Sequence, residues 1–387
     1  MSDTILCLNA GSSSFKFRAY RPARGSDPEE LLRGQVENLG PAARMQFQLT
    51  GGTRETSEIG VADHAIALSV VIGRVTEALG ETTVRGVGHR IVHGGTDFTG
   101  PVDLTPPVLT RLAALSPLAP LHQPGNLAAV DAAIAAFPDA LQIGCFDTAF
   151  HRGHPWVNDT FALPRRYYAK GVRRYGFHGL SYDYITGEIA RDEPGLHRGR
   201  VAIAHLGAGA SICAVRCGRS VASTMGFSAL DGLPMGTRCG QLDPGVLLYM
   251  MDQEGLSPAQ ITQLLYRESG LKGLSGLSGD MKELEASTTA QAREAIDYFV
   301  FRIRREIGAL AMVLGGLDAL VFTGGIGENS ALIRQKVTDG MGWIGVDVSQ
   351  EKNAVNARDI GTGPVRVMVF PTDEERVIAR ALAERLQ

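Results

Sequence analysis

Two stretches half a chain apart share one pattern, and they constrain the fold more than any other feature. Residues 5–17 read ILCLNAGSSSFKF and residues 201–215 read VAIAHLGAGASICAV. In each, an apolar run is broken by small turn residues and resumes at once, which is typical of a β-hairpin. Gly11 and Gly207 lie 207 − 11 = 196 residues apart in a chain of 387 residues. One copy per half predicts two similar domains that face a shared cleft.

The turns of these hairpins suit an anion. A turn of Gly and Ser leaves backbone N–H groups uncovered and adds hydroxyls, which together can bind phosphate. Asn9 and Lys16 flank the first turn. Small turn residues also join many hairpins that bind nothing. The duplication nevertheless favours two phosphate-binding turns that contact one polyphosphate.

Composition narrows the class of protein. The length suggests two domains, and 44% hydrophobic with 20% charged residues is typical of a soluble globular protein. A net charge of −3 argues against a nucleic-acid partner. Five scattered cysteines favour a reducing, cytoplasmic location, and we expect neither a signal peptide nor a membrane span.

The stretch GHRIVHGG, residues 88–95, carries a candidate acid-binding arginine. If it is a strand, its period of two places Arg90 and Val92 on one face. A guanidinium binds carboxylate through two hydrogen bonds, and the valine methyls suit a short alkyl tail. The alternative is an arginine at a sheet edge in water.

Three further side chains stand where predicted elements begin or end. Asp147 follows a buried strand predicted over 141–146, and open α/β sheets bind ligands at that edge, although Asp is also a common helix cap. His122 precedes a predicted helix, where it either donates to a phosphate or only packs. His178 lies in a glycine-containing turn, a position that is more often structural than catalytic.

The second half contains three glycine-rich segments with a candidate function. Residues 225–245, which include Arg238, and residues 271–282 read as ordered Gly-rich loops. After a long helix predicted over 293–314, a buried strand opens through Gly324, Gly325 and Gly327 onto a helix predicted to begin near Asn329, whose N-terminus can bind an anion.

Two residues near the C-terminus fit a capping box. Thr372 is followed three residues later by Glu375, which is the spacing of that motif. This interpretation gives Glu375 a structural task and leaves Glu374 without one, although any carboxylate at a helix start also complements the helix dipole.

Ten motifs occur together in one order: NAGSSSFKF, GHRIVHGG, PLAPLHQPGN, FDTAFH, YGFHGLSY, HLGAGAS, GFSALDGLPMGTRCGQLDPG, SGLSGDMK, FTGGIGENS and PTDEE. In this the chain resembles the acetate kinases, within the wider group of acetate and sugar kinases, Hsp70 and actin. The resemblance covers essentially the whole chain. It implies an α/β fold of duplicated actin-like (ribonuclease H-like) domains with a cleft between them, and a homodimer. The domains would be 1–148, on which the helix of 371–387 packs, and 149–370, for nucleotide binding and dimerisation.

The resemblance implies Mg²⁺-dependent phosphoryl transfer from ATP to acetate or another short-chain carboxylate, giving acetyl phosphate and ADP by direct in-line transfer; Mn²⁺ can substitute. By position, the catalytic residues would be Asp147, His178 and Arg238, with His122 supporting. The acid pocket would consist of Arg90, Val92, Leu121, Phe177 and Ala229. Asn9 and Glu374 would be the magnesium-linked residues. The nucleotide contacts would be Lys16, His205, Leu206, Gly207, Ala208, Gly209, Asp280, Met281, Lys282, Gly325, Ile326, Gly327, Glu328 and Asn329.

The chain departs from the family pattern at two positions. Ala208 stands where the family usually has Asn, which removes one amide contact toward the phosphates and puts nucleotide affinity in question. Ala229 stands where the family often has Pro, so the acid pocket is expected to be larger. One methylene there is worth about 1–3 kcal/mol of discrimination, and we expect propionate to be tolerated better than in a proline-bearing relative.

Other functions remain open to different degrees. A propionate or butyrate kinase shares nearly every motif. A sugar or glycerol kinase fits less well, because the face of Arg90 and Val92 suits an anion with a small alkyl group. A nonenzymatic ATP clamp like Hsp70 or actin would not need that arginine. A dinucleotide dehydrogenase would show a βαβ fingerprint after the first strand, and none is present.

Overall fold

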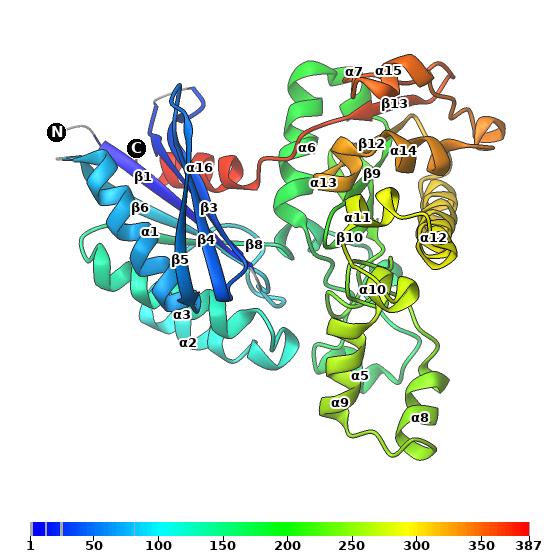
Figure 1. Cartoon of the computed structure of the whole chain (residues 1–387), viewed down its shortest axis with the longest axis horizontal. Coiled ribbons are helices and arrows are strands. Elements are labelled where there is room, and N and C mark those ends of the chain that lie inside the picture. Colours follow the sequence, from blue (N-terminus) through cyan, green and yellow to red (C-terminus); the bar gives the residue numbers. More distant parts are fainter. Residues whose placement is uncertain (1–2, 12–13, 24–25, 81, 387) are drawn as a thin grey trace. The chain divides into compact units, whose positions relative to one another are not determined.

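The chain forms two compact units in the computed structural model, which describes residues 3–11, 14–23, 26–80 and 82–386. One unit combines Met1–Phe150 with Asp373–Gln387, and the other is His151–Thr372 (Figure 1). The sequence places the boundaries after residues 148 and 370, and the structure places each of them two residues later. The serine turn of the first hairpin, at residues 12–13, lies outside the described residues.

The first unit is built on a mixed sheet with the order β5-β4-β3-β2-β1-β6-β8-β7. β1 is antiparallel to β2 and parallel to β6, and β6 is parallel to β8. The strands are β1 (Asp3–Ala10), β2 (Phe15–Arg21), β3 (Glu29–Glu37), β4 (Gly40–Leu49), β5 (Arg54–Ala62), β6 (Thr83–Ile91), β7 (Val102–Asp103) and β8 (Leu141–Phe146). The helices are α1 (His64–Leu79), α2 (Pro106–Ala113), α3 (Gln123–Ala136) and α16 (Glu374–Arg385), with short 3₁₀ turns η1 (Ser116–Leu118) and, across the boundary, η2 (Ala149–His151).

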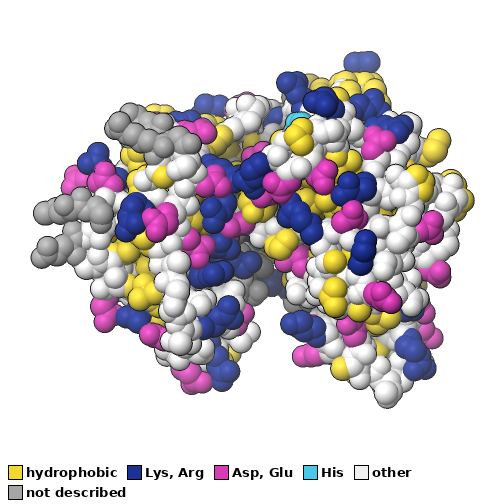
Figure 2. Space-filling view, turned by 90° about the horizontal axis from the view of Figure 1, so that it is seen from above, with side chains coloured by type: hydrophobic (Ala, Val, Ile, Leu, Met, Phe, Trp, Pro, Cys, Tyr) yellow, Lys and Arg dark blue, Asp and Glu magenta, His cyan; other side chains and the backbone are white. Residues whose placement is uncertain are grey.

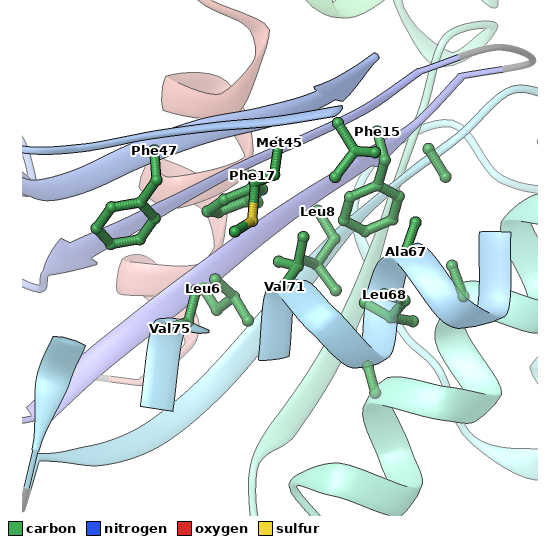
Figure 3. Packing of buried hydrophobic residues seen from close by; sticks show 14 of the residues in the cluster. Leu6, Leu8, Phe15, Phe17, Met45, Phe47, Ala67, Leu68, Val71 and Val75 are labelled. Atoms are coloured by element: carbon green, nitrogen blue, oxygen red, sulfur yellow. The ribbon is translucent and has the colours of Figure 1, made fainter. Parts of the chain in front are cut away.

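The main core of this unit lies between the sheet and α1 (Figure 3). Phe15 and Phe17 alternate along β2 with Lys16 and Arg18, so the aromatic rings enter the core and the cations face the other side of the sheet. The other labelled core residues are Leu6, Leu8, Met45, Phe47, Ala67, Leu68, Val71 and Val75. The predicted first hairpin is therefore present, with one apolar and one polar face.

Helix α16 covers the opposite face of the same sheet, where it packs on β1 and β6. Gly86 and Gly88 make this close approach possible. A Cβ added at Gly88 would lie 2.3 Å from Cγ2 of Ile378, and one at Gly86 would lie 2.8 Å from Cδ1 of Leu382. The last helix of the chain thus belongs to the unit formed by the first residues, which brings its N-terminus to the sheet edge that carries Asn9.

The second unit repeats the strand pattern of the first. Its sheet has the order β11-β10-β9-β12-β13, in which β9 is antiparallel to β10 and parallel to β12, as β1 is to β2 and β6. The strands are β9 (Arg200–Leu206), β10 (Ala210–Arg216), β11 (Arg219–Ser223), β12 (Ala319–Thr323) and β13 (Arg366–Val369). The predicted α/β fold with two similar mixed sheets is confirmed.

Helices α6 and α12 lie on opposite sides of this second sheet (Figure 1). The longer helices of the unit are α6 (Gly179–Asp192), α8 (Pro244–Asp252), α12 (Ala290–Leu314) and α14 (Ala331–Thr338). The shorter ones are α4 (Trp156–Asp159), α5 (Arg165–Ala169), α7 (Pro194–His197), α9 (Pro258–Gln263), η3 (Leu264–Glu268), α10 (Gly270–Ser275), α11 (Met281–Ala286), α13 (Gly324–Asn329), η4 (Gly342–Ile344) and α15 (Gln350–Ala354).

Two predicted segments of the second unit need correction. Residues 271–282 are not one loop, because α10 ends within them and α11 begins there, capped by the Asp280 side chain. Helix α13 begins at Gly324 and not near Asn329. Gly324 adopts φ +78°, and a Cβ there would lie 2.7 Å from the Leu206 carbonyl oxygen, so glycine lets the helix start directly against β9.

Charged side chains of both signs are interspersed on the face shown in Figure 2, as expected for a net charge close to zero. In the described part of the chain, no helix combines the length and the apolar character that crossing a bilayer requires.

Two buried histidines and a partly buried one predict a loss of stability in acid. Burial lowers the pKa of His89 and of His151 to about 4 and that of His154 to about 3. Below about pH 6.5 the unfolded chain binds protons that the folded chain does not, so the free energy of unfolding falls between about pH 6.5 and 4, by roughly 1.4 kcal/mol per pH unit for each histidine. Urea unfolding of wild type and His89→Gln at pH 7 and pH 5 tests this. The variant should lose less stability on acidification, and equal losses would contradict the prediction.

Candidate active site

Three predicted site residues of the first unit meet at the carboxyl ends of its parallel strands. Asn9 lies near the end of β1, Arg90 near the end of β6, and Asp147 directly after β8. Nε and Nη2 of Arg90 donate to the two carboxylate oxygens of Asp147 at 2.8 and 2.6 Å. Nη1 of Arg90 donates to Oδ1 of Asn9 at 3.0 Å. Strand order thus joins residues that are far apart in the sequence.

The N-terminus of α16 completes this cluster with two carboxylates. Nδ2 of Asn9 donates to Glu374 at 3.2 Å and to Glu375 at 2.8 Å. The capping box predicted for Thr372 and Glu375 is wrong, because Asp373 caps the helix by accepting from the backbone N–H of Arg376. Glu375 is instead buried against Asn9, so both glutamates belong to the site.

Arg18 is a member of this cluster that the sequence interpretation missed. Its guanidinium contacts Asp373 at 2.8 Å and Glu375 at 3.4 Å. Arg18 follows Lys16 by two residues on β2, so both side chains lie on the sheet face that α16 covers. That spacing was the available signal. Lys16 itself is exposed and pairs in register with Asn9.

The electrostatics of the cluster are dominated by the pair of Arg90 and Asp147. Burial raises the pKa of Asp147 above its ordinary value, and the charge and hydrogen bonds of Arg90 oppose that rise. Burial lowers the pKa of Arg90, but the carboxylates of Asp147 and Glu374 raise it more, so it stays above its ordinary value. Among the described residues, three of the five guanidinium N–H groups of Arg90 are used, which leaves one on each Nη for a ligand.

The oxygen atoms around Asn9 fit a hard divalent cation. Magnesium prefers oxygen ligands and is usually held by one or two carboxylates together with phosphates and water. Glu374 supplies a carboxylate that keeps 14% side-chain exposure, and Asn9 directs its amide nitrogen to this carboxylate and its amide oxygen to Arg90. Within the described residues no group of three or more His, Cys, Asp or Glu side chains could hold a metal ion. The arrangement therefore suits an ion shared with a bound phosphate.

The other predicted residues of the first unit lie on neighbouring segments. Val92 is buried, two residues beyond Arg90, and its backbone N–H donates to Oδ1 of Asn126 at 3.0 Å. Leu121 and His122 directly precede α3, with the Leu121 side chain exposed and His122 at the N-cap position. The structure places them in the first unit with Arg90.

The second unit brings His178 and Arg238 to the tip of its hairpin. A Cβ added at Gly209 would lie 3.0 Å from Nε2 of His178 and 2.9 Å from Nη2 of Arg238. Only glycine fits there without displacing the two side chains. Gly209 also accepts a hydrogen bond from the backbone N–H of Gly207 at 3.0 Å. A ring nitrogen and a guanidinium therefore flank backbone that suits an anion.

His178 is held in an uncommon conformation by several partners. Its φ of +57° lies in the left-handed region, which costs a residue other than glycine on the order of 1–3 kcal/mol. Nδ1 of His178 lies 2.8 Å from Oγ of Ser211, and its ring stacks on His205 with centroids 4.4 Å apart. Oγ of Ser181 lies 2.8 Å from Nδ1 of His205. Such strain is typical of functional sites. The two serines lie within the motifs YGFHGLSY and HLGAGAS, but the sequence interpretation gave them no role.

The remaining nucleotide candidates lie around the hairpin tip, on α11 and on α13. The carbonyl of Ala208 accepts from the backbone N–H of Gly236 at 3.2 Å. Oε1 of Glu328 accepts from the backbone N–H groups of Gly324 and Thr372, at 2.9 and 3.1 Å, so it holds the start of α13. The other candidates on these segments are Leu206, Met281, Lys282, Gly325, Ile326, Gly327 and Asn329, of which Leu206, Met281 and Gly327 are buried.

Two acid-pocket candidates lie in the second unit. Phe177 is buried directly before His178. The carbonyl oxygen of Ala229 accepts from Nη1 of Arg238 at 2.7 Å. Arg238 belongs to the 225–245 loop, so its side chain contacts Ala229 of its own loop and also lies at the hairpin tip.

The family model and the related proteins match nearly the whole chain. The model of the acetokinase family matches residues 4–380. The acetate kinase of Methylocella silvestris is 53% identical over 98% of this chain and 97% of its own. The crystal structure of Porphyromonas gingivalis acetate kinase gives a TM-score of 0.86 at 36% identity, covering 100% of both chains. That of a propionate kinase from Francisella tularensis gives 0.90 at 34% identity, covering 98% of both. The chain belongs to the acetokinase family.

Proposed function

We propose that this protein is an acetate kinase of the cytoplasm, which transfers the γ-phosphoryl group of ATP reversibly to acetate and forms acetyl phosphate and ADP. The observation that carries the proposal is the likeness along the whole chain to proteins named acetate kinase. The enzyme class is a phosphotransferase with a carboxyl group as acceptor. The geometry of Arg90 supports it, because the guanidinium keeps two N–H groups for an acid.

The first unit would bind and orient the acid. Acetate is already ionised near neutral pH, so its attack on phosphorus needs no strong base. Arg90 would bind the carboxylate, and the two hydrogen bonds from Arg90 to Asp147 support an orienting task for the aspartate. Val92 and Leu121 are the candidates of this unit for contact with the methyl group, and Phe177 and Ala229 are those of the second unit.

The second unit would hold the nucleotide and stabilise the moving phosphoryl group. Its charge is spread over three oxygens in the transition state, which Arg238 and His178 would neutralise as donors, with His122 in support. The backbone of residues 205–209, 280–282 and 325–329 would contact the nucleotide, and Lys16 would add a contact from the first hairpin. Asn9 and Glu374 would hold Mg²⁺, which supplies positive charge to the phosphates when bound.

A series of acids separates this function from that of a propionate or butyrate kinase. Steady-state kinetics with acetate, propionate and butyrate, each with ATP and with GTP, should give the highest kcat/KM for acetate with ATP. We expect propionate to follow within about 10- to 200-fold, since Ala229 leaves room for one methylene. A higher kcat/KM for propionate would favour the alternative, and no turnover of any acid would contradict both.

We also propose that the chain forms a homodimer through its second unit. Helix α8 has no buried residue, and Leu248, Tyr249 and Met251 on it are all exposed. Phe301 is exposed on α12. Exposed apolar groups of this size favour association. Sedimentation velocity should show twice the chain mass of 41.3 kDa, and a monomer would contradict the proposal.

A further inference from the structure

Two consecutive side chains hold the backbone that leads to His178. Nη2 of Arg152 donates to the carbonyl oxygens of Arg174 and Tyr175, both at 2.9 Å. Nε2 of His151 lies 3.0 Å from the carbonyl oxygen of Phe177, the residue directly before His178. The turn that carries His178 is thus fixed at three of its carbonyl groups.

The hydrogen bonds around His151 allow one arrangement of protons. A carbonyl oxygen only accepts, so Nε2 of His151 carries the proton and donates to Phe177. Nδ1 of the neutral ring must then accept, and the Ser220 hydroxyl, at 2.8 Å, is its donor. The Ser220 oxygen in turn accepts from Nε2 of His154 at 2.7 Å and from the thiol of Cys213, whose sulfur lies 3.2 Å away. The series His154, Ser220, His151, Phe177 therefore runs in one direction.

Packing also holds the ring of His151 in place. Its side chain is fully buried, and a Cβ added at Gly176 would lie 2.5 Å from Cδ2 of His151. Gly176 has φ +73°, so glycine is needed there for both conformation and space. Burial lowers the pKa of His151 to about 4, which keeps the ring neutral at ordinary pH.

We propose that His151 is a positioning residue for His178. Its ring, oriented by Ser220, holds the Phe177 carbonyl, and this keeps His178 at φ +57° with Nε2 close to the hairpin tip at Gly209. His151 acts through the backbone, because its two ring nitrogens are engaged by Ser220 and by the Phe177 carbonyl. The proposal rests on the proposed acetate kinase function and adds a residue that supports its phosphoryl-transfer step.

A pair of substitutions at residue 151 separates the hydrogen bond from mere packing. His151→Gln keeps an amide N–H that can reach the Phe177 carbonyl, whereas His151→Asn is too short. We expect His151→Asn to lower kcat by about 10- to 100-fold with KM for acetate and ATP nearly unchanged, since a misplacement of about 1 Å costs up to that much. His151→Gln should recover most of kcat. Equal kcat values for both variants and wild type would overturn the proposal.

A buried histidine of the first unit provides the matched control. His89 is also buried with a pKa of about 4, and it has one side-chain hydrogen bond, to Gln142 at 2.8 Å. His89→Asn should reduce stability while leaving kcat at the wild-type value. A kcat loss in His89→Asn equal to that in His151→Asn would show a general effect of removing a buried histidine and would overturn the proposal.

The tautomer of His151 can be measured without any turnover. Imidazole ¹⁵N shifts of histidine-labelled protein should show His151 protonated at Nε2 in wild type, and Ser220→Ala should perturb the Nδ1 resonance. Protonation at Nδ1 in wild type would overturn the proposal. If wild type failed to phosphorylate acetate, the proposed function would fall, while the ¹⁵N shifts would still decide whether His151 holds the turn.

Discussion

Replacing Arg238 with alanine is expected to lower kcat by about 10³-fold, the scale of an arginine that stabilises a transferring phosphoryl group. KM for ATP should change by less than about 3-fold, because the guanidinium is needed chiefly in the transition state. The structural reason is that Arg238 lies beside His178 at the hairpin tip, where its Nη2 would be 2.9 Å from a Cβ placed on Gly209. Initial rates at varied ATP and saturating acetate measure both constants.

A control arginine in the same unit separates chemistry from folding. Arg302 is buried on α12, donates to Oε1 of Gln241 at 2.9 Å and is not one of the proposed site residues. Arg302→Ala should lower Tm and leave kcat close to wild type. A large rise in the ATP KM of Arg238→Ala with kcat intact would contradict the role of Arg238, since it would indicate ground-state nucleotide binding.

The second large effect is expected from Arg90→Lys, which keeps the charge and loses the planar pair of donors. KM for acetate should rise by about 10- to 100-fold, because hydrogen bonds to a charged group are worth about 1.5–3 kcal/mol each. Asp147 is 2% exposed and would lose one of its two bonds, so Tm should also fall. Acetate titrations at saturating ATP, together with thermal unfolding, give both values.

A second pair of the same geometry provides the control for Arg90. Arg200 donates through Nε and Nη2 to Asp318 at 3.0 and 2.6 Å, in the other unit and in an exposed setting. Arg200→Lys breaks the same two-point contact and should leave KM for acetate unchanged. An unchanged acetate KM in Arg90→Lys would contradict the assignment of Arg90 to the acid.

Much of the fold could be predicted from local patterns. The hairpins of residues 5–17 and 201–215 are determined by apolar runs around small turns, and the buried stripe of α12 follows its helical period. The strand over 141–146 was predicted at its observed bounds, with Asp147 at its end. Membership of the acetokinase family, predicted from ten ordered motifs, is confirmed by the comparisons.

Other features depend on contacts that local patterns do not carry. The partner of Glu375 is Asn9, 366 residues earlier, so the spacing from Thr372 led to a wrong capping box. The hydrogen bond of His151 to the Phe177 carbonyl joins two segments that both lie within the ten motifs, but neither motif reveals that they touch. The early start of α13 depends on Gly324 fitting against Leu206 on another strand. Each of these features depends on a tertiary contact between distant segments, and such a contact cannot be inferred from one segment alone.

The most direct measurement traps the product. Incubation with ATP, Mg²⁺, acetate and hydroxylamine should give acetyl hydroxamate from wild type only when ATP, Mg²⁺ and acetate are all present. Arg90→Lys should approach the wild-type yield only as acetate is raised. ATP hydrolysis without hydroxamate, at any acetate concentration, would contradict phosphoryl transfer to a carboxylate and with it the tasks assigned to the two units.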